Sequence, residues 1–564
     1  MDREGHIAAM ATVAETVAQS LHDAGVRLAF GMPGGEVVSV MEALREVGIG
    51  FELMHHEQSA VFAADAYARA TGKPGCALTT LGPGALNAVP GIGHAWLDRA
   101  PVVLITAQKP DSVLPDYTHQ VVDLQAVIGP IVKRTLKVTP QNAASEVPPT
   151  VALTMQGRPG PVHLQISNEE AELSIEGASV QTARQMSFGE GELNGNGGLP
   201  DGDQLARARE IVTKASRPVV LAGLGLEPEA PYDALRALAE AANAPVIVSP
   251  KGKGALSDDH PLSAGVMGLT RTDPVYEILE EADCVVAVGF DVVELVKEFS
   301  LPKGRQTGLA TENESVPLVW IANWANYDPV LPAAVELVGP MAEALVHLAD
   351  SEFSTDVQWG ESRVRALRAK LAAVPLPTPG PGHLLPQQLL ESMRRHLPAE
   401  ALLAVDVGSH KIFGSLEWPT LSPNCFALSN GLSCMGFGLP AAIGTALAKP
   451  DELATCLIGD GGMLMCLGEL AVLARLDLPV IVVVAVDNAI DLIRSHQIRQ
   501  GKKPFGTEFP APDFCKIAAG HGIAAKRVTT PEGCDEALAQ AAAARAPFLI
   551  EAIIDPIGYP TTPR

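Results

Sequence analysis

The sequence predicts an α/β protein made of three doubly wound domains, each built around a parallel sheet. Apolar runs of strand length alternate with helical segments along most of the 564 residues. The 52 glycines fit a chain with many strand-to-helix turns. Two stretches, SFGEGELNGNGGLPDGD at 187–203 and VPLPTPGPGH at 374–383, are polar or proline-rich and can bury little surface. The domains and linkers that we expect are, in chain order, domain 1–186, linker 187–203, domain 204–352, linker 353–385 and domain 386–564.

The first domain is predicted from a regular alternation of helices and strands that starts near Val13. A helix ends at Gly25, and the strand RLAF leads into the turn Gly31-Met32-Pro33-Gly34-Gly35. The next elements are the helix EVVSVMEALREVG, the strand FELM, the helix QSAVFAADAYARATG, the strand CALTTLG, a helix up to Trp96 and the strand PVVLITAQ. Glu57 stands between the strand FELM and its helix, at the edge where such sheets place ligands. Taken alone, Glu57 is an ordinary helix N-terminal acid that the helix dipole stabilises.

The second domain is a further α/β unit with four apolar strands. We expect these strands at 218–225, 244–250, 283–290 and 317–323. The first loop contains Gly223-Leu224-Gly225, which resembles part of a dinucleotide-binding fingerprint. The third glycine of that fingerprint is missing, so we interpret this run as a structural turn rather than a nucleotide site.

The third domain contains the stretch with the clearest chemistry, IGDGGMLMCLGELAVLARLDLPVIVVVAVDNAI at 458–490. It predicts a strand, a turn at Gly459-Asp460-Gly461-Gly462, a helix to about Arg475 and a buried strand at Val480–Val486. Clustered glycines before a helix let backbone N–H groups approach an anion, so a phosphate suits this turn. A strand–helix–strand crossover brings Asp460 and Asp487 to the same sheet edge. Two carboxylates beside a phosphate suggest Mg²⁺.

Composition excludes several classes of partner. The formal charge is 41 − 65 = −24, which argues against binding nucleic acid or an anionic membrane. No apolar run is long enough to span a membrane, and the start MDREGHIAAM does not have the composition of a signal peptide. The eight cysteines are scattered without a CxxC pair. We therefore expect reduced thiols in a cytoplasmic protein.

The run from Asp460 to Asp487 resembles the diphosphate motif of thiamine diphosphate (ThDP) enzymes, which reads GDG, a spacer of this length and then Asn or Asp. By this resemblance Mg²⁺ is held by Asp460, by the Asp487 side chain and by the backbone carbonyl of Ala489, with Asn488 as the alternative ligand. The backbone of Gly461 and Gly462 would lie against the diphosphate.

A second resemblance covers the first domain. The string HHEQSAVFAADAYARATGKPGCALTTLGPGALNAVPGIGHAWLDRAPVVLITAQ is similar to the pyrimidine-binding domain of the acetolactate synthase-like ThDP family, and nearly the whole chain follows that family's domain order. The catalytic glutamate of the family falls on Glu57. Its chemical role is to share a proton with N1′ of the pyrimidine, so that the cofactor's own amino group can remove the C2 proton.

The same resemblance implies roles for the remaining candidate residues. Gly34 and Gly35 match a loop that packs against the cofactor of the neighbouring subunit, while His119 and Gln120 match a pair near the substrate. The positions implied for the third domain lie along the diphosphate or between the two cofactor rings: Gly408, Ser409, His410, Ser433 and Met435. Without the family, His410 is an ordinary loop histidine and Met435 is core filler.

The resemblance implies a Mg²⁺–ThDP enzyme that decarboxylates a 2-oxo acid, pyruvate by default, and joins the remaining fragment to a second carbonyl. The resemblance argues against FAD, since VGFDVVELVKEF at 288–299 replaces the GARFDDR-like run of the FAD-containing relatives. Because Glu57 and the diphosphate motif lie on different domains, and in this family on different subunits, we expect a homodimer or homotetramer. Three alternatives stay open: a simple 2-oxo acid decarboxylase, a carboligase with an unusual acceptor and a non-catalytic ThDP-binding protein.

Overall fold

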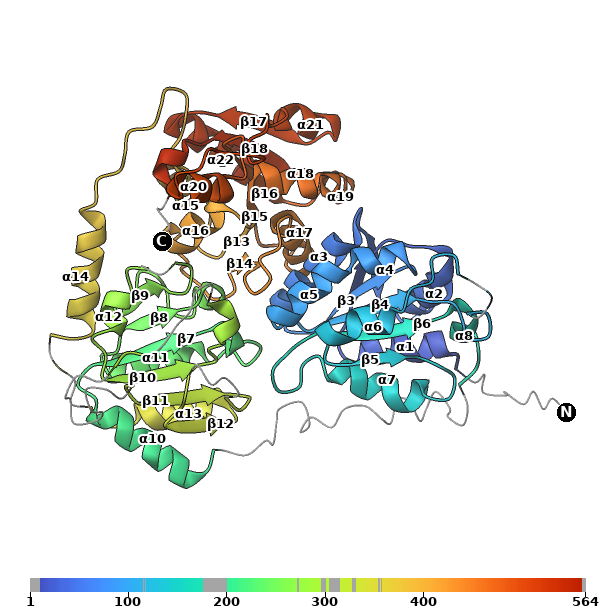
Figure 1. The fold of residues 1–564 in the computed structure, drawn as a ribbon, viewed down its shortest axis with the longest axis horizontal. Coiled ribbons are helices and arrows are strands. Elements are labelled where there is room, and N and C mark those ends of the chain that lie inside the picture. Colours follow the sequence, from blue (N-terminus) through green and yellow to red (C-terminus); the bar gives the residue numbers. More distant parts are fainter. Residues whose placement is uncertain are drawn as a thin grey trace. The chain divides into compact units, whose positions relative to one another are not determined.

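The computed structural model describes residues 11–114, 116, 118–175, 200–270, 273–295, 301–303, 315–326, 331–353, 356 and 358–559. These residues form three six-stranded sheets flanked by helices, and every pairing between strands in the sheets is parallel (Figure 1). The predicted fold class is therefore confirmed. The chain divides into two compact units, Met1–Leu193 and Asn194–Arg564, so one unit holds the first sheet and the other holds two. Most of the predicted linker 187–203 lies outside the described residues.

The first sheet has the strand order β2-β1-β3-β4-β6-β5. Its strands are β1 (Leu28–Gly31), β2 (Gly50–Leu53), β3 (Gly75–Thr79), β4 (Val102–Ala107), β5 (Thr135–Lys137) and β6 (Val162–Ile166). Its helices are α1 (Val13–Asp23), α2 (Val38–Glu46), α3 (Glu57–Thr71), α4 (Pro83–Asn87), α5 (Val89–Leu97), α6 (Leu124–Ile128), α7 (Ala143–Ala152) and α8 (Asn168–Ala171). All residues of β3 and β4 are buried, as expected for central parallel strands covered on both faces.

The second sheet has the order β12-β11-β10-β7-β8-β9, the arrangement of doubly wound dinucleotide-binding folds. Its strands are β7 (Pro218–Ala222), β8 (Val246–Val248), β9 (Ser263–Val266), β10 (Cys284–Val288), β11 (Leu318–Ala322) and β12 (Val335–Val338). Its helices are α10 (Gly202–Lys214), α11 (Tyr232–Ala241), α12 (Tyr276–Leu279), α13 (Met341–Ala349) and α14 (Glu361–Ala372). Strands β9 and β12 were not among the four strands predicted for this domain. Helix α14 lies inside the predicted linker 353–385, and its Val364 and Leu367 pack in the core of this sheet.

The third sheet has the order β14-β13-β15-β16-β18-β17, the same connectivity as the first. Its strands are β13 (Leu402–Val405), β14 (Phe426–Leu428), β15 (Ala454–Gly459), β16 (Val480–Val486), β17 (Ala524–Val528) and β18 (Phe548–Ile553). Its helices are α15 (Pro386–His396), α16 (Ser409–Glu417), α17 (Gly438–Ala448), α18 (Asp460–Met465), α19 (Leu470–Leu476), α20 (Asp491–Arg499), α21 (Phe514–Gly520) and α22 (Pro531–Ala544). From β13 the chain crosses to β14 on one side, and from β14 it crosses back to β15 on the other side of β13. This reversal is a topological switch point, where such sheets bind ligands.

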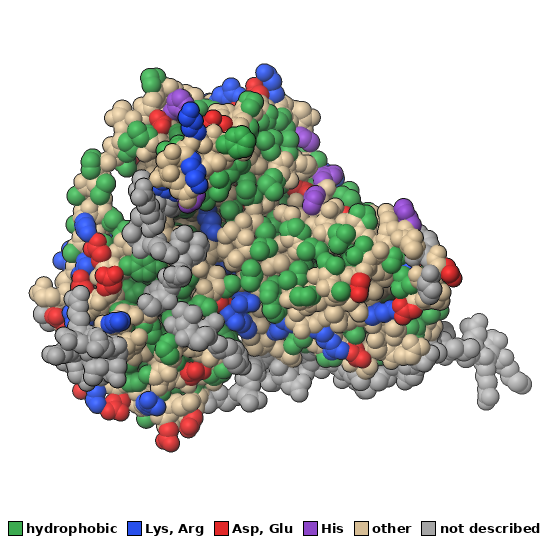
Figure 2. Space-filling model, in the orientation of Figure 1, with side chains coloured by type: hydrophobic (Ala, Val, Ile, Leu, Met, Phe, Trp, Pro, Cys, Tyr) green, Lys and Arg blue, Asp and Glu red, His purple; other side chains and the backbone are tan. Residues whose placement is uncertain are grey.

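The surface carries both signs of charge. On the face shown in Figure 2, Lys and Arg side chains of the described residues lie singly or in small groups among acidic, apolar and neutral ones. Within the described ranges, no helix combines the length and the apolar character that crossing a membrane would require.

Candidate active site

A cavity of about 180 Å³ opens at the switch point of the third sheet. Four loops line it: those after β13, before α17, after β15 and after β16. The structure brings together here all ten candidate residues of the third domain: Gly408, Ser409, His410, Ser433, Met435, Asp460, Gly461, Gly462, Asp487 and Ala489. Residues that lie far apart in the sequence therefore share one concave site.

Asp460 holds the loop after β15 to the loop after β16. It is the first residue of α18 and follows β15 directly, so the predicted turn is a sharp strand-to-helix step. Its Oδ1 accepts the N–H of Gly461 at 2.8 Å, and its Oδ2 accepts the N–H of Asn488 at 2.7 Å. The crossover from β15 to β16 therefore places Asp460 beside the loop of Asp487, as the spacing predicts.

Asp487 is a carboxyl group whose charged form is disfavoured in this site. Its Oδ1 accepts the N–H of Ala489 at 3.0 Å, and its Oδ2 accepts the hydroxyl of Tyr559 at 2.7 Å. Burial, together with repulsion from Asp460 and Asp491, raises the pKa of Asp487 to about 7, although the Tyr559 hydrogen bond favours the ionised form. Burial also raises the pKa of Asp460. A hard divalent cation would relieve both effects, so the donor set fits Mg²⁺.

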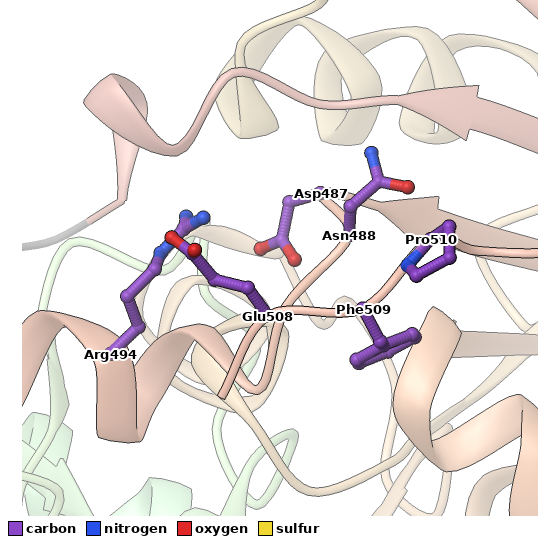
Figure 3. A pocket seen from close by; sticks show the side chains of 6 residues that line it. All are labelled: Asp487, Asn488, Arg494, Glu508, Phe509 and Pro510. Carbon is purple, nitrogen blue, oxygen red and sulfur yellow. The ribbon is translucent and has the colours of Figure 1, made fainter. Parts of the chain in front are cut away.

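The outer side of the Asp487 loop borders a second, open pocket of about 590 Å³ (Figure 3). Figure 3 shows the Asn488 side chain directed away from the Asp487 carboxylate. The Asn488 side-chain oxygen accepts the N–H of Ala511 at 3.0 Å, so it is engaged with the chain that follows α20. Arg494 and Glu508 point toward one another in the same pocket.

His410 lines the cavity with a buried ring. Its Nε2 has no hydrogen-bond partner within the described residues. Burial lowers the pKa of His410 to about 3, so the imidazole is neutral. A Cβ on Gly408 or Gly459 would lie 2.6 or 2.8 Å from the ring, so both glycines are needed for this approach. A diphosphate bound here would place an acceptor beside this nitrogen and would favour the form of the ring in which Nε2 carries a proton.

Ser409 lines the cavity, and its hydroxyl is hydrogen-bonded within the protein. Its hydroxyl donates to Asp491 Oδ2 at 2.9 Å, so it bonds to a carboxylate rather than standing free for a diphosphate. Asp491 is buried, and its Oδ1 also accepts a hydrogen bond from Nη2 of Arg494 at 2.7 Å. No individual role was predicted for Asp491, Arg494 or Tyr559. An acid and a base one helical turn apart after the metal motif were a usable signal for the first two.

The loop of Met435 is fixed by a buried carboxylate. Asp406, just after β13, accepts the N–H groups of Gly436, Phe437 and Gly438 at 3.1, 2.7 and 3.2 Å. Burial raises the pKa of Asp406 to about 6, and the three backbone donors oppose that effect. Met435 is thus held at the N-terminus of α17, where it lines the cavity.

The positions near Met435 are also closely packed. A Cβ on Gly461 would lie 2.6 Å from Ile490 Cδ1 and 3.5 Å from Met435 Cε. Ser433 has a positive φ of 54°. Its hydroxyl oxygen accepts a hydrogen bond from the ammonium group of the buried Lys411 at 3.2 Å.

In the first unit, Glu57, Gln120 and Gly34 lie around the turn after β3. Glu57 is buried as the first residue of α3, and Asn87 Nδ2 donates to its Oε2 at 3.0 Å. A Cβ on Gly84 would lie 3.1 Å from Glu57 Oε1, and one on Gly82 would lie 2.5 Å from the Gln120 carbonyl oxygen.

The other candidates of this unit vary in exposure. A Cβ on Gly34 would lie 2.7 Å from the Thr80 side chain, so Gly34 also packs against this turn. Gln120 has a positive φ of 59°, and both Gln120 and His119 are exposed. Gly35 has open space at its Cβ position.

The Gly223-Leu224-Gly225 turn of the second domain is occupied by the chain itself. The buried Glu294 carboxylate accepts the N–H of Leu224 at 2.8 Å, the N–H of Lys251 at 2.9 Å and the Ser249 hydroxyl at 2.6 Å. The cavity beside this turn has a volume of only about 20 Å³. Burial raises the pKa of Glu294 to about 7.

Comparison with known proteins matches three stretches of this chain. Models of the thiamine pyrophosphate enzymes match at residues 11–127 (N-terminal TPP binding domain), 205–347 (central domain) and 406–552 (C-terminal TPP binding domain). A probable acetolactate synthase large subunit of Methanococcus aeolicus is 30% identical over 96% of this chain and 92% of its own. The acetolactate synthase isozyme 3 large subunit of Escherichia coli K12 is 30% identical over 94% of this chain and 92% of its own.

Proposed function

Because this chain belongs to the acetolactate synthase-like ThDP-dependent enzymes, we propose that it decarboxylates pyruvate and joins the remaining two-carbon fragment to a second 2-oxo acid. With pyruvate as acceptor, two molecules of pyruvate give one acetolactate and one CO₂. When bound, ThDP supplies a carbon nucleophile and accepts the electrons released as CO₂ leaves. The observation that supports the proposal best is the collection of all ten candidate residues of the third domain around one cavity.

In this proposal Mg²⁺ is held by Asp460, Asp487 and the backbone carbonyl of Ala489. The raised pKa values of both acids and their common cavity support this assignment. Ala489 is preferred to Asn488 because the Asn488 side chain is turned away and bonded to Ala511. Held by these oxygens, the metal would supply positive charge that favours binding of the cofactor's diphosphate.

The remaining cavity residues would bind and orient the cofactor. His410 Nε2 and the backbone of Gly408, Gly461 and Gly462 would contact the diphosphate. Ser433 and Met435 would contact the rings, with Asp406 fixing the loop that carries them. Ser409 would act by orienting Asp491, or would rotate to the diphosphate when it binds.

Glu57 would hold the proton that is shared with N1′ of the pyrimidine. Asn87 fixes one carboxyl oxygen, and Gly84 leaves space for the other. Burial of Glu57 excludes water from that exchange. Gln120 and His119 are exposed on the same unit and would contact the substrate.

We also propose that the enzyme does not need FAD. Glu294 already takes the Leu224 N–H that a dinucleotide phosphate would use at this turn, which supports the proposal. The assembly would be a homodimer or homotetramer, with each active site formed by Glu57 of one subunit and the diphosphate cavity of another. The site would work in the cytoplasm.

The test is turnover of pyruvate by the purified protein with Mg²⁺ and ThDP and without FAD, following pyruvate, CO₂ and the organic product. The proposal predicts pyruvate, CO₂ and acetolactate in a ratio of 2:1:1. Equal amounts of CO₂ and acetaldehyde would instead identify a simple decarboxylase. Turnover only with another acceptor would identify a different carboligase. ThDP binding without turnover of any 2-oxo acid would identify a non-catalytic binding protein.

A further inference from the structure

Tyr559 contacts the Asp487 carboxylate from the C-terminal end of the described chain. Its hydroxyl donates to Asp487 Oδ2 at 2.7 Å, and Tyr559 lines the cavity of about 180 Å³. The Tyr559 ring is stacked on the buried Phe413 of α16, with ring centroids 5.7 Å apart and an interplanar angle of 11°. The phenol is therefore directed at the carboxylate by packing as well as by the hydrogen bond.

The segment that presents Tyr559 is anchored on both sides. The Asp555 carboxylate accepts the N–H of Gly380 at 2.7 Å and the N–H of Ile557 at 3.0 Å. Gln387 of α15 donates to the carbonyl of Gly558 at 2.8 Å. A Cβ on Gly558 would lie 2.6 Å from Pro386 Cδ, so this residue packs directly on α15. These contacts fix the position of the residue next to Tyr559.

The two hydrogen bonds on Asp487 determine which way its carboxylate faces. Oδ1 accepts the Ala489 N–H from its own loop, whereas Oδ2 accepts the Tyr559 hydroxyl from a segment 72 residues away. Without the phenol, the carboxylate can rotate about its last bond, because only one oxygen is still held. A second bond to a metal-binding carboxylate typically changes metal affinity by about 10–100-fold.

We propose that Tyr559 is a positioning residue for Asp487, and that it pre-orients this carboxylate to bind Mg²⁺. The inference rests on the proposed assignment of Asp487 as a metal ligand. Tyr559 itself stays out of the metal's coordination shell and acts only through its hydrogen bond. It therefore affects metal affinity more than it affects binding of ThDP once the metal is saturating.

The test is calorimetric titration of Mg²⁺ and of ThDP into wild type and Y559F. Phenylalanine keeps the stack on Phe413 and removes only the hydroxyl. We expect Mg²⁺ affinity, measured with ThDP present, to fall about 10–100-fold. ThDP affinity at saturating Mg²⁺ should stay within about twofold, and excess Mg²⁺ should restore turnover. The matched control is Y276F, which removes the hydroxyl of a partly buried tyrosine beside an acid, Asp273, in the second domain.

Two outcomes would overturn the inference while leaving the proposed function intact. In one, Y559F binds Mg²⁺ as tightly as wild type does. In the other, Mg²⁺ affinity falls, ThDP affinity at saturating Mg²⁺ falls with it, and the melting temperature falls as well. That combination indicates a purely structural role. If wild type itself shows no Mg²⁺-dependent ThDP binding, the proposed function fails and this inference fails with it.

Discussion

Replacing Glu57 with glutamine separates proton transfer from structure at the proposed catalytic carboxyl. Glutamine has nearly the same shape, and its side-chain oxygen can still accept the Asn87 amide that lies 3.0 Å from Glu57 Oε2. Exchanging a charge-assisted hydrogen bond for a neutral one should cost about 1 kcal/mol of folding free energy. Losing a general acid–base group should lower turnover by about 10²–10⁴-fold. Folding should therefore change little while activity falls steeply.

Two assays measure these effects on the same samples. Pyruvate turnover gives the loss of activity, and the rate of hydrogen–deuterium exchange at C2 of bound ThDP gives the loss of proton removal. Both rates should fall, while ThDP affinity remains similar. The control is E52Q, since Glu52 is a buried acid of the neighbouring strand β2 that we do not place in the site. Turnover and exchange of E57Q within about threefold of wild type would refute the assigned role.

Three further changes test other parts of the site. D460N should weaken Mg²⁺-dependent ThDP binding by at least about 100-fold in calorimetry, because the amide removes a charged ligand and places an NH₂ group against a backbone N–H; unchanged binding would exclude Asp460 as a ligand. G462A should destabilise the protein by about 1–3 kcal/mol in denaturant unfolding, since its Cβ would lie 2.0 Å from Asp406 Oδ2, whereas G520A, with open space, should not. The pKa of Glu294 is raised from 4.5 to about 7, so between these pH values the folded chain keeps the Glu294 proton that the unfolded chain has lost. The contribution of Glu294 to stability is therefore full below pH 4.5 and is lost as the pH rises to about 7. From pH 5 to 7, wild type should lose about 2 kcal/mol of stability relative to E294Q in tryptophan-monitored unfolding, and parallel pH profiles would contradict this.

The sequence predicted the parts of the fold that have strong local patterns. Strand β16 covers Val480–Val486, as its continuous apolar run indicates. The meeting of Asp460 with the loop of Asp487 follows from the handedness and parallel pairing of a crossover, so motif spacing was enough to predict it.

Weaker patterns were not readable from the sequence alone. Strand β12 has alternating burial over only four residues, which is too short to distinguish from a loop. Helix α14 buries only Val364 and Leu367 among mostly polar residues, so it resembled a linker. The Tyr559–Asp487 bond joins segments that no periodicity connects, and tertiary packing alone determines it.

A crystal structure of the protein with ThDP and with Mn²⁺ in place of Mg²⁺ would test the proposed metal site directly, because the anomalous signal of manganese locates the metal. We expect one strong peak between Asp460 and Asp487, within about 2.0–2.3 Å of a carboxylate oxygen of each. The Ala489 carbonyl should be the third protein ligand, and diphosphate oxygens should complete the shell. A peak elsewhere, or ThDP bound without a metal between these two acids, would contradict the proposed active site.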